Sequence, residues 1–177
     1  HCEDNSMLTM ARLRLAEAGR ISPRWQGVSR PATAEAVAVH QVLELAHELD
    51  DAPVYIVHVS SAAAVLEIAR ARMEGQSNIY VETCPQYLTL SEERYLEPNF
   101  GGAKYVCSPP LRRARDAEAL IEAVQAGEID TIATDHCSYT LAQKALGVGD
   151  FSKIPNGLPS IEHRPALIYS ILVATKK

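Results

Sequence analysis

The stretch that decides the fold is Pro53-Val-Tyr-Ile-Val-His-Val59, which Ser60 and Ser61 follow directly. Its side chains are mostly apolar and β-branched, without a strict alternation of polar and apolar positions. That pattern is typical of a strand that is buried on both faces of a parallel sheet. Serines are good caps for a helix, which we expect to run to about Met73. A buried strand followed at once by a helix indicates an α/β fold.

The rest of the chain repeats this alternation. Apolar residues at helical spacing predict further helices, and short β-branched runs predict further strands. We expect helices over 6–18, 33–49, 114–126 and about 160–173, strands over 78–83 and 131–134, a candidate very short strand at 105–107, and a loop over 21–31. Strands that alternate with helices predict a parallel sheet within one α/β domain.

Two features of the charged residues follow from the same patterns. Glu35 does not lie on the apolar face of its helix, so we expect its side chain to point outward. Arg112, Arg113 and Arg115 form a short basic cluster, which we interpret as a solvated helix start.

Composition excludes several classes of protein. The 177 residues are 47% hydrophobic and 22% charged, which is typical of a globular domain and not of a disordered chain. A formal net charge of -5 argues against nucleic acid or an anionic membrane as the main partner. No apolar run approaches the roughly 20 residues that span a bilayer, and no signal peptide is visible.

The cysteines indicate a reducing compartment. Cys2, Cys84, Cys107 and Cys137 contain no CxxC pair, which argues against a structural zinc site. Cys84 and Cys107 lie in apolar surroundings and are expected to be reduced and packed, so we predict a cytoplasmic protein. The chain begins with His1 and its first motif follows at once, so we expect it to be a piece of a longer protein.

Polar side chains follow the predicted strands, where the chemistry of parallel α/β folds is found. His58 ends one strand and is either a hydrogen-bonded core residue or a metal ligand. Asp135 follows another strand, and a carboxylate buried there must be paired, hydrogen-bonded or bound to a metal. Imidazoles and a carboxylate together suit Zn²⁺ and similar divalent ions.

The motifs as a series resemble those of the dihydropyrimidinases and D-hydantoinases, the cyclic amidases of the amidohydrolase superfamily. They occur in the order of that family and cover nearly the whole chain. The segments that carry the resemblance are His1-Cys-Glu-Asp-Asn5, Tyr55-Ile-Val-His-Val-Ser60, Glu82-Thr-Cys-Pro-Gln-Tyr87, Tyr105-Val-Cys-Ser-Pro-Pro-Leu-Arg112, Ala133-Thr-Asp-His-Cys137, Gln143-Lys-Ala-Leu-Gly147, Lys153-Ile-Pro-Asn-Gly-Leu-Pro159 and Glu162-His-Arg164.

The resemblance implies a partial (β/α)8 TIM-type barrel with parallel strands. Residues 1–177 would form its second half, about strands 5–8, as a partial amidohydrolase barrel domain, with the N-terminal half-barrel and the C-terminal β-sandwich absent. His1 would be the metal ligand that ends the fifth strand, His58 the ligand that ends the sixth, and Asp135 the carboxylate that ends the eighth.

The resemblance also implies the chemistry. Family members hold two divalent metals, predicted to be Zn²⁺, and a metal-bound hydroxide attacks the ring carbonyl. Asp135 would be the catalytic residue that accepts a proton and passes it to the departing ring nitrogen. Ser108 and Asn156 match the positions whose main-chain groups hold the cyclic amide. The substrate would be a dihydropyrimidine or a 5-substituted hydantoin, opened to an N-carbamoyl amino acid, and the enzyme a homo-oligomer, as the tetrameric relatives are.

Parts of the family pattern are missing from the chain. The HxH pair, the bridging lysine and the tyrosine that stabilises the oxyanion all belong upstream. We therefore expect the 177-residue chain to bind one metal or none, and to be nearly inactive alone. Open sheet edges and an uncovered apolar face would also favour self-association.

Other interpretations remain open. The chain could descend from a non-catalytic scaffold of the collapsin response mediator type, or from an enzyme like allantoinase or dihydroorotase. A cysteine nucleophile is a further alternative, because His136 and Cys137 are adjacent. We expect instead that Cys137 is a packed thiol, and that Glu3 and Glu82 make hydrogen bonds in loops.

Overall fold

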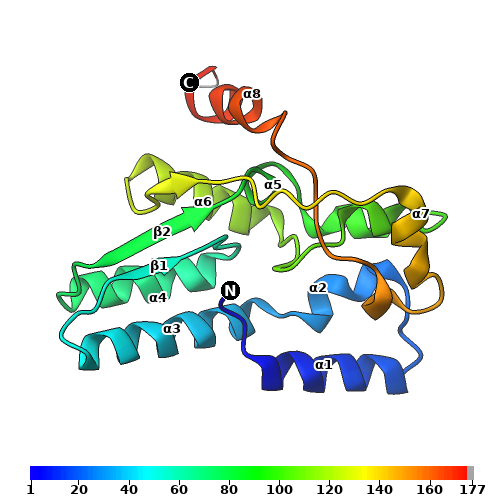
Figure 1. The fold of residues 1–177 in the computed structure, drawn as a ribbon, viewed down its shortest axis with the longest axis horizontal. Coiled ribbons are helices and arrows are strands. Elements are labelled where there is room, and N and C mark those ends of the chain that lie inside the picture. Colours follow the sequence, from blue (N-terminus) through cyan, green and yellow to red (C-terminus); the bar gives the residue numbers. More distant parts are fainter. Residues whose placement is uncertain (175–177) are drawn as a thin grey trace.

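A computed structural model describes residues 1–174 as an α/β fold built on a small parallel sheet (Figure 1). The three strands are β1 (Val54–Ile56), β2 (Ile79–Thr83) and β3 (Thr131–Ile132), and they lie in that order. Both pairings are parallel. The predicted fold class is thus confirmed in its main features.

Helices connect and flank the strands. The α-helices are α1 (Asn5–Glu17), α2 (Gln26–Ser29), α3 (Ala32–Glu48), α4 (Ala62–Met73), α5 (Pro85–Thr89), α6 (Ala114–Gln125), α7 (Leu141–Lys144) and α8 (Arg164–Tyr169). Short 3-10 helices occupy Pro23–Trp25, Glu92–Leu96, Gly101–Tyr105, Ala145–Gly147 and Phe151–Lys153, and a π-helical turn occupies Ser170–Ala174.

The sheet is covered on one face only. Helices α3 and α4 run along one side of the strands (Figure 1), and Ile79, Val81 and Thr83 of β2 are buried. On the opposite face Tyr55 is 49% exposed and Tyr80 is 48% exposed. The expectation of a strand buried on both faces is therefore wrong, because no element of residues 1–174 packs over those tyrosines.

Local capping explains where two helices begin. The Ser61 side chain accepts a hydrogen bond from the Ala64 amide at the start of α4, as the sequence predicts. Helix α1 is instead capped by Asp4, whose carboxylate accepts from the Met7 amide. The predicted helix bounds elsewhere agree with the structure to within one or two residues for α1, α3 and α6.

Three expected segments differ. Residues 105–107 form no strand, because the 3-10 helix Gly101–Tyr105 takes up the first of them. The expected loop over 21–31 contains the 3-10 helix Pro23–Trp25 and then α2. The last helix begins later than expected, at Arg164. Among residues 1–174, no helix combines the length and the apolar character that crossing a bilayer requires.

Candidate functional site

His58 and Asp135 share an unusual backbone conformation. His58 follows β1 and has φ of 42°, and Asp135 follows β3 and has φ of 44°. Positive φ is uncommon outside glycine, and strained residues of this kind cluster at active sites. Both residues lie just past the carboxyl ends of strands in one parallel sheet, which is the edge where the sequence analysis placed the chemistry.

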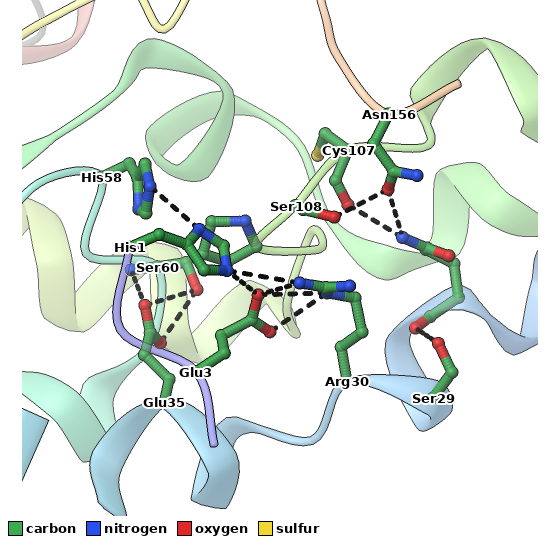
Figure 2. A network of polar contacts seen from close by, with 12 residues as sticks. His1, Glu3, Ser29, Arg30, Glu35, His58, Ser60, Cys107, Ser108 and Asn156 are labelled. Atoms are coloured by element: carbon green, nitrogen blue, oxygen red, sulfur yellow. Dashed lines mark hydrogen bonds and ion pairs between the residues drawn. The ribbon is translucent and has the colours of Figure 1, made fainter. Parts of the chain in front are cut away.

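The structure brings His1 and His58 together. Nδ1 of His1 lies 3.2 Å from Nε2 of His58, and their rings meet edge to face with centroids 4.9 Å apart (Figure 2). His58 is 9% exposed, and its Nδ1 atom is buried without a partner among the described residues. Burial lowers the pKa of His58, and the charge of Asp135 opposes that shift. Burial thus favours the neutral imidazole, which keeps one ring nitrogen as an acceptor or metal ligand.

Glu3 and Arg30 hold His1 from its other side. The Glu3 carboxylate lies 2.7 Å from Nε2 of His1 and is itself paired with Arg30, whose Nε donates to both carboxylate oxygens (Figure 2). A proton on Nε2 of His1 can therefore bond to Glu3, which leaves the Nδ1 lone pair directed toward His58. Glu3 was expected to make a hydrogen bond in a loop. Its carboxylate instead contacts His1 and pairs with Arg30.

A second buried network lies beneath His58. Both carboxylate oxygens of Glu35 accept from Ser60, and Arg112 donates from Nε to the Ser60 hydroxyl. Desolvation raises the pKa of Glu35, and the positive charge of Arg112 opposes that shift. Glu35 is only 2% exposed and Arg112 only 7%. The expectations of an outward Glu35 and a solvated Arg112 are wrong, because the two side chains pair with each other, 3.6 Å apart.

Ser108 and Asn156 also meet, although 48 residues separate them. The Ser108 hydroxyl donates to Oδ1 of Asn156 over 2.8 Å, and Nε2 of Gln26 donates to the same oxygen over 2.9 Å (Figure 2). The main-chain N–H and C=O groups of Ser108 and Asn156 have no partner within residues 1–174. They remain available to bind a ligand. Gln26 was missed because its sequence context resembles an ordinary loop.

Asp135 is not gathered with the two histidines into one cluster. It is exposed, and its charge acts on His58 from a distance. Across residues 1–174, no group of three or more His, Cys, Asp or Glu side chains is arranged to hold a metal ion. The structure thus joins His1 and His58, and it places Asp135 beyond a strand of the same sheet.

The cysteines give little support to a thiol nucleophile. Cys84 and Cys107 are free and buried, as expected, and burial raises the pKa of Cys107 to about 12. Cys137 is exposed, so the expectation of a packed thiol is wrong. Nδ1 of His136 accepts from the amide of Ser160, so this nitrogen is occupied by the backbone and is not paired with the neighbouring Cys137 thiol.

Comparisons with known proteins extend this picture. The chain is 42% identical over 174 residues to a D-hydantoinase of Streptomyces coelicolor, a match that covers 98% of the chain and 37% of that protein. It is 40% identical over 176 residues to a D-phenylhydantoinase of Escherichia coli, which covers 99% of the chain and 38% of that protein. No family model matches the chain.

Solved structures agree with the sequence matches. A dihydropyrimidinase from Brevibacillus agri superposes with a TM-score of 0.92 at 42% identity, over 96% of the chain and 36% of that structure. A D-hydantoinase superposes with a TM-score of 0.95 at 39% identity, over 100% of the chain and 38% of that structure. The resemblance to dihydropyrimidinases and hydantoinases is confirmed, and the chain spans little more than a third of the length of these relatives.

Proposed function

We propose that the chain is part of a metal-dependent hydrolase that opens cyclic amides, either dihydropyrimidines or 5-substituted hydantoins, to N-carbamoyl amino acids. The observation that carries the proposal is the facing pair of imidazole nitrogens of His1 and His58, the latter just past the end of β1, in a chain about 40% identical to hydantoinases. Residues 1–177 would form the second half of a (β/α)8 barrel, in which a preceding half-barrel covers the open face of the sheet.

The two histidines fit a divalent metal. Zinc–nitrogen bonds are about 2.0–2.1 Å long, so two nitrogens at adjacent corners of a tetrahedron lie about 3.4 Å apart. The observed 3.2 Å between Nδ1 of His1 and Nε2 of His58 is close to that spacing. A carboxylate bonded to the far nitrogen of a histidine is the common support of a metal ligand, and Glu3 occupies that position. Asp135 is the proposed third ligand from this chain.

Each remaining residue has a proposed task. When bound, the metal would polarise the ring carbonyl and lower the pKa of water. Asp135 would accept a proton and return it to the ring nitrogen as the bond breaks. A cyclic amide presents a C=O and an N–H on neighbouring atoms. The unpaired main-chain groups of Ser108 and Asn156 are complementary to both.

We further propose that the 177-residue chain binds one metal weakly and hydrolyses little by itself. Only the two histidines lie together, and Asp135, the proposed third ligand, is exposed and apart from them, whereas a catalytic zinc site ordinarily has three protein ligands and an open position. The remaining ligands of a two-metal centre would come from parts of the barrel outside residues 1–177. A cytoplasmic location and a homo-oligomeric enzyme stay predictions.

The proposal is tested by titrating Zn²⁺ into the chain in a calorimeter. We expect binding that the His58→Ala substitution removes and the His47→Ala substitution leaves unchanged, because His47 is exposed at the far end of α3. Equal binding by the two variants would contradict the assignment. Absence of binding even in a version extended to the length of its relatives would favour a non-catalytic scaffold.

Ring-opening of hydantoin and dihydrouracil in the presence of Zn²⁺ tests the proposed low activity of the chain alone. We expect the chain alone to show only traces of turnover. Turnover comparable to that of a full-length hydantoinase would refute the expected inactivity, and it would strengthen the assignment of the reaction.

A further inference from the structure

A buried lysine lies behind the two proposed amide-binding residues. Nζ of Lys144 donates to the main-chain oxygens of Val106, Pro155 and Gly157, at 2.8, 2.7 and 3.0 Å. The residue is only 3% exposed. An ammonium group has three donors, and here all three reach a carbonyl. None of these partners is a carboxylate.

These three carbonyls belong to the two segments that hold the proposed ligand contacts. Val106 lies two residues before Ser108, and Pro155 and Gly157 lie on either side of Asn156. The Gly157 amide also donates to the Val106 oxygen, over 3.0 Å. One ammonium group therefore joins two segments that are about fifty residues apart in the chain.

Gln26 makes a second connection between the same segments. Its Nε2 donates to the Cys107 oxygen and to Oδ1 of Asn156, each over 2.9 Å, and it is only 3% exposed. Figure 2 shows Cys107, Ser108 and Asn156 gathered around these contacts. Lys144 comes from α7 and Gln26 from α2, so the two segments are fixed by two independent elements.

We propose that Lys144 and Gln26 are positioning residues for the cyclic-amide site, which set the distance and the orientation between the main-chain groups of Ser108 and Asn156. The identity of the ligand rests on the proposed function. We call the contacts of Lys144 and Gln26 with the two segments the clamp, and these contacts lie within the chain. In this proposal both residues act on the ligand through the segments of Ser108 and Asn156, which they hold.

The chemistry of the two side chains favours this role over simple packing. An ammonium group is costly to bury, and an apolar side chain would fill the same volume without that cost. What an apolar side chain cannot do is hold three carbonyl oxygens at hydrogen-bond distance. The capping box of Thr140 and Gln143 fixes the short helix α7 and thereby fixes where Lys144 begins.

The test compares Lys144→Met with Lys153→Met. Lys153 is a matched control, because its side chain is 71% exposed and pairs with Asp150 on the surface. Two quantities are measured on the 177-residue chain. They are the NMR signals of the Ser108 and Asn156 amides, and the dissociation constant of hydantoin from a titration followed by NMR.

We expect Lys144→Met to shift the amide signals and to weaken hydantoin binding at least tenfold, while Lys153→Met changes neither. Urea denaturation of the same variants separates positioning from stability, since a purely structural lysine would lower the unfolding free energy and leave the affinity of the folded chain unchanged. That result, or unshifted amide signals, would overturn the proposal.

A second variant keeps the test decisive if Lys144→Met does not fold. Gln26→Glu retains the size of the side chain but removes the donor to Asn156, and we expect the same shift of signals and the same loss of affinity. If the unaltered chain binds no hydantoin, the proposed contact of the Ser108 and Asn156 main-chain groups with the ring amide fails for this chain. The positioning role is then tested by the NMR signals of the Ser108 and Asn156 amides alone. Unshifted signals in Lys144→Met and Gln26→Glu overturn it.

Discussion

Replacing Arg112 by methionine should destabilise the chain far more than any surface substitution. Arg112 is 7% exposed, and its guanidinium lies 3.6 Å from the carboxylate of Glu35, which is 2% exposed. It also bonds to the Ser60 hydroxyl and to the Arg30 main-chain oxygen. Removing it leaves a buried carboxylate without its positive partner.

The expected magnitude follows from the burial of both groups. Breaking a buried ion pair by removing one partner costs about 3–5 kcal/mol, because the remaining charge is uncompensated. The loss of unfolding free energy caused by Arg112→Met should become smaller as pH falls. The folded-state pKa of Glu35 is already above its ordinary value, and without Arg112 it rises further. Between the pKa of Glu35 in the unfolded chain, 4.5, and its higher pKa in the folded variant, the folded state binds more protons than the unfolded state. The unfolding free energy of Arg112→Met therefore falls as pH rises through this window.

The assay is urea denaturation at pH 7 and at pH 5, with Arg113→Met as the control. The side chain of Arg113 is 65% exposed, so its loss should cost less than about 1 kcal/mol. The double variant Glu35→Leu with Arg112→Met should regain most of the stability, because it removes both charges. A loss below about 1 kcal/mol for Arg112→Met, or one that grows as pH falls, would refute this reasoning.

Three further predictions concern single residues. Glu3→Gln should weaken Zn²⁺ binding about 10- to 100-fold in calorimetry, because a neutral amide supports the far nitrogen of His1 less well; an affinity equal to that of Glu17→Gln, an exposed control, would contradict this. Burial lowers the pKa of Lys144 to about 8 from 10.5, so the unfolded state binds more protons between these values. The unfolding free energy of the unaltered chain should therefore rise by up to about 3 kcal/mol from pH 8 to 10.5, relative to Lys144→Met, in thermal denaturation; a flat difference would count against it. His58→Gly should be more stable than His58→Ala by up to about 1 kcal/mol, since φ of 42° favours glycine, and the reverse order in urea denaturation would be incompatible with this backbone strain.

Local patterns were sufficient for most of the fold. The helical spacing of apolar residues located α3 and α6, and the β-branched run before His58 located β1. The Ser61 cap is visible in the sequence because it acts over only three residues. Such features depend on neighbours along the chain, which a single sequence displays.

The polar pairs were invisible for the opposite reason. Glu35 and Arg112 are 77 residues apart, and each alone resembles a solvated charge. Gln26 lies in a stretch rich in proline and glycine, which reads as a loop. Lys144 belongs to a motif that the sequence shows, but its three carbonyl partners become apparent only when two distant segments meet.

The spacing of the two histidines follows from these buried pairs. His1 is held through Glu3 by the guanidinium of Arg30, and the main-chain oxygen of Arg30 accepts from Arg112. Arg112 in turn donates to Ser60, which lies two residues beyond His58. A continuous series of charged hydrogen bonds therefore runs from one imidazole to the segment that holds the other. Because a buried charge is costly unless it is paired and hydrogen-bonded, these contacts oppose displacement of either ring. This series explains how residues 1 and 58, which are far apart in the sequence, hold their ring nitrogens 3.2 Å from each other.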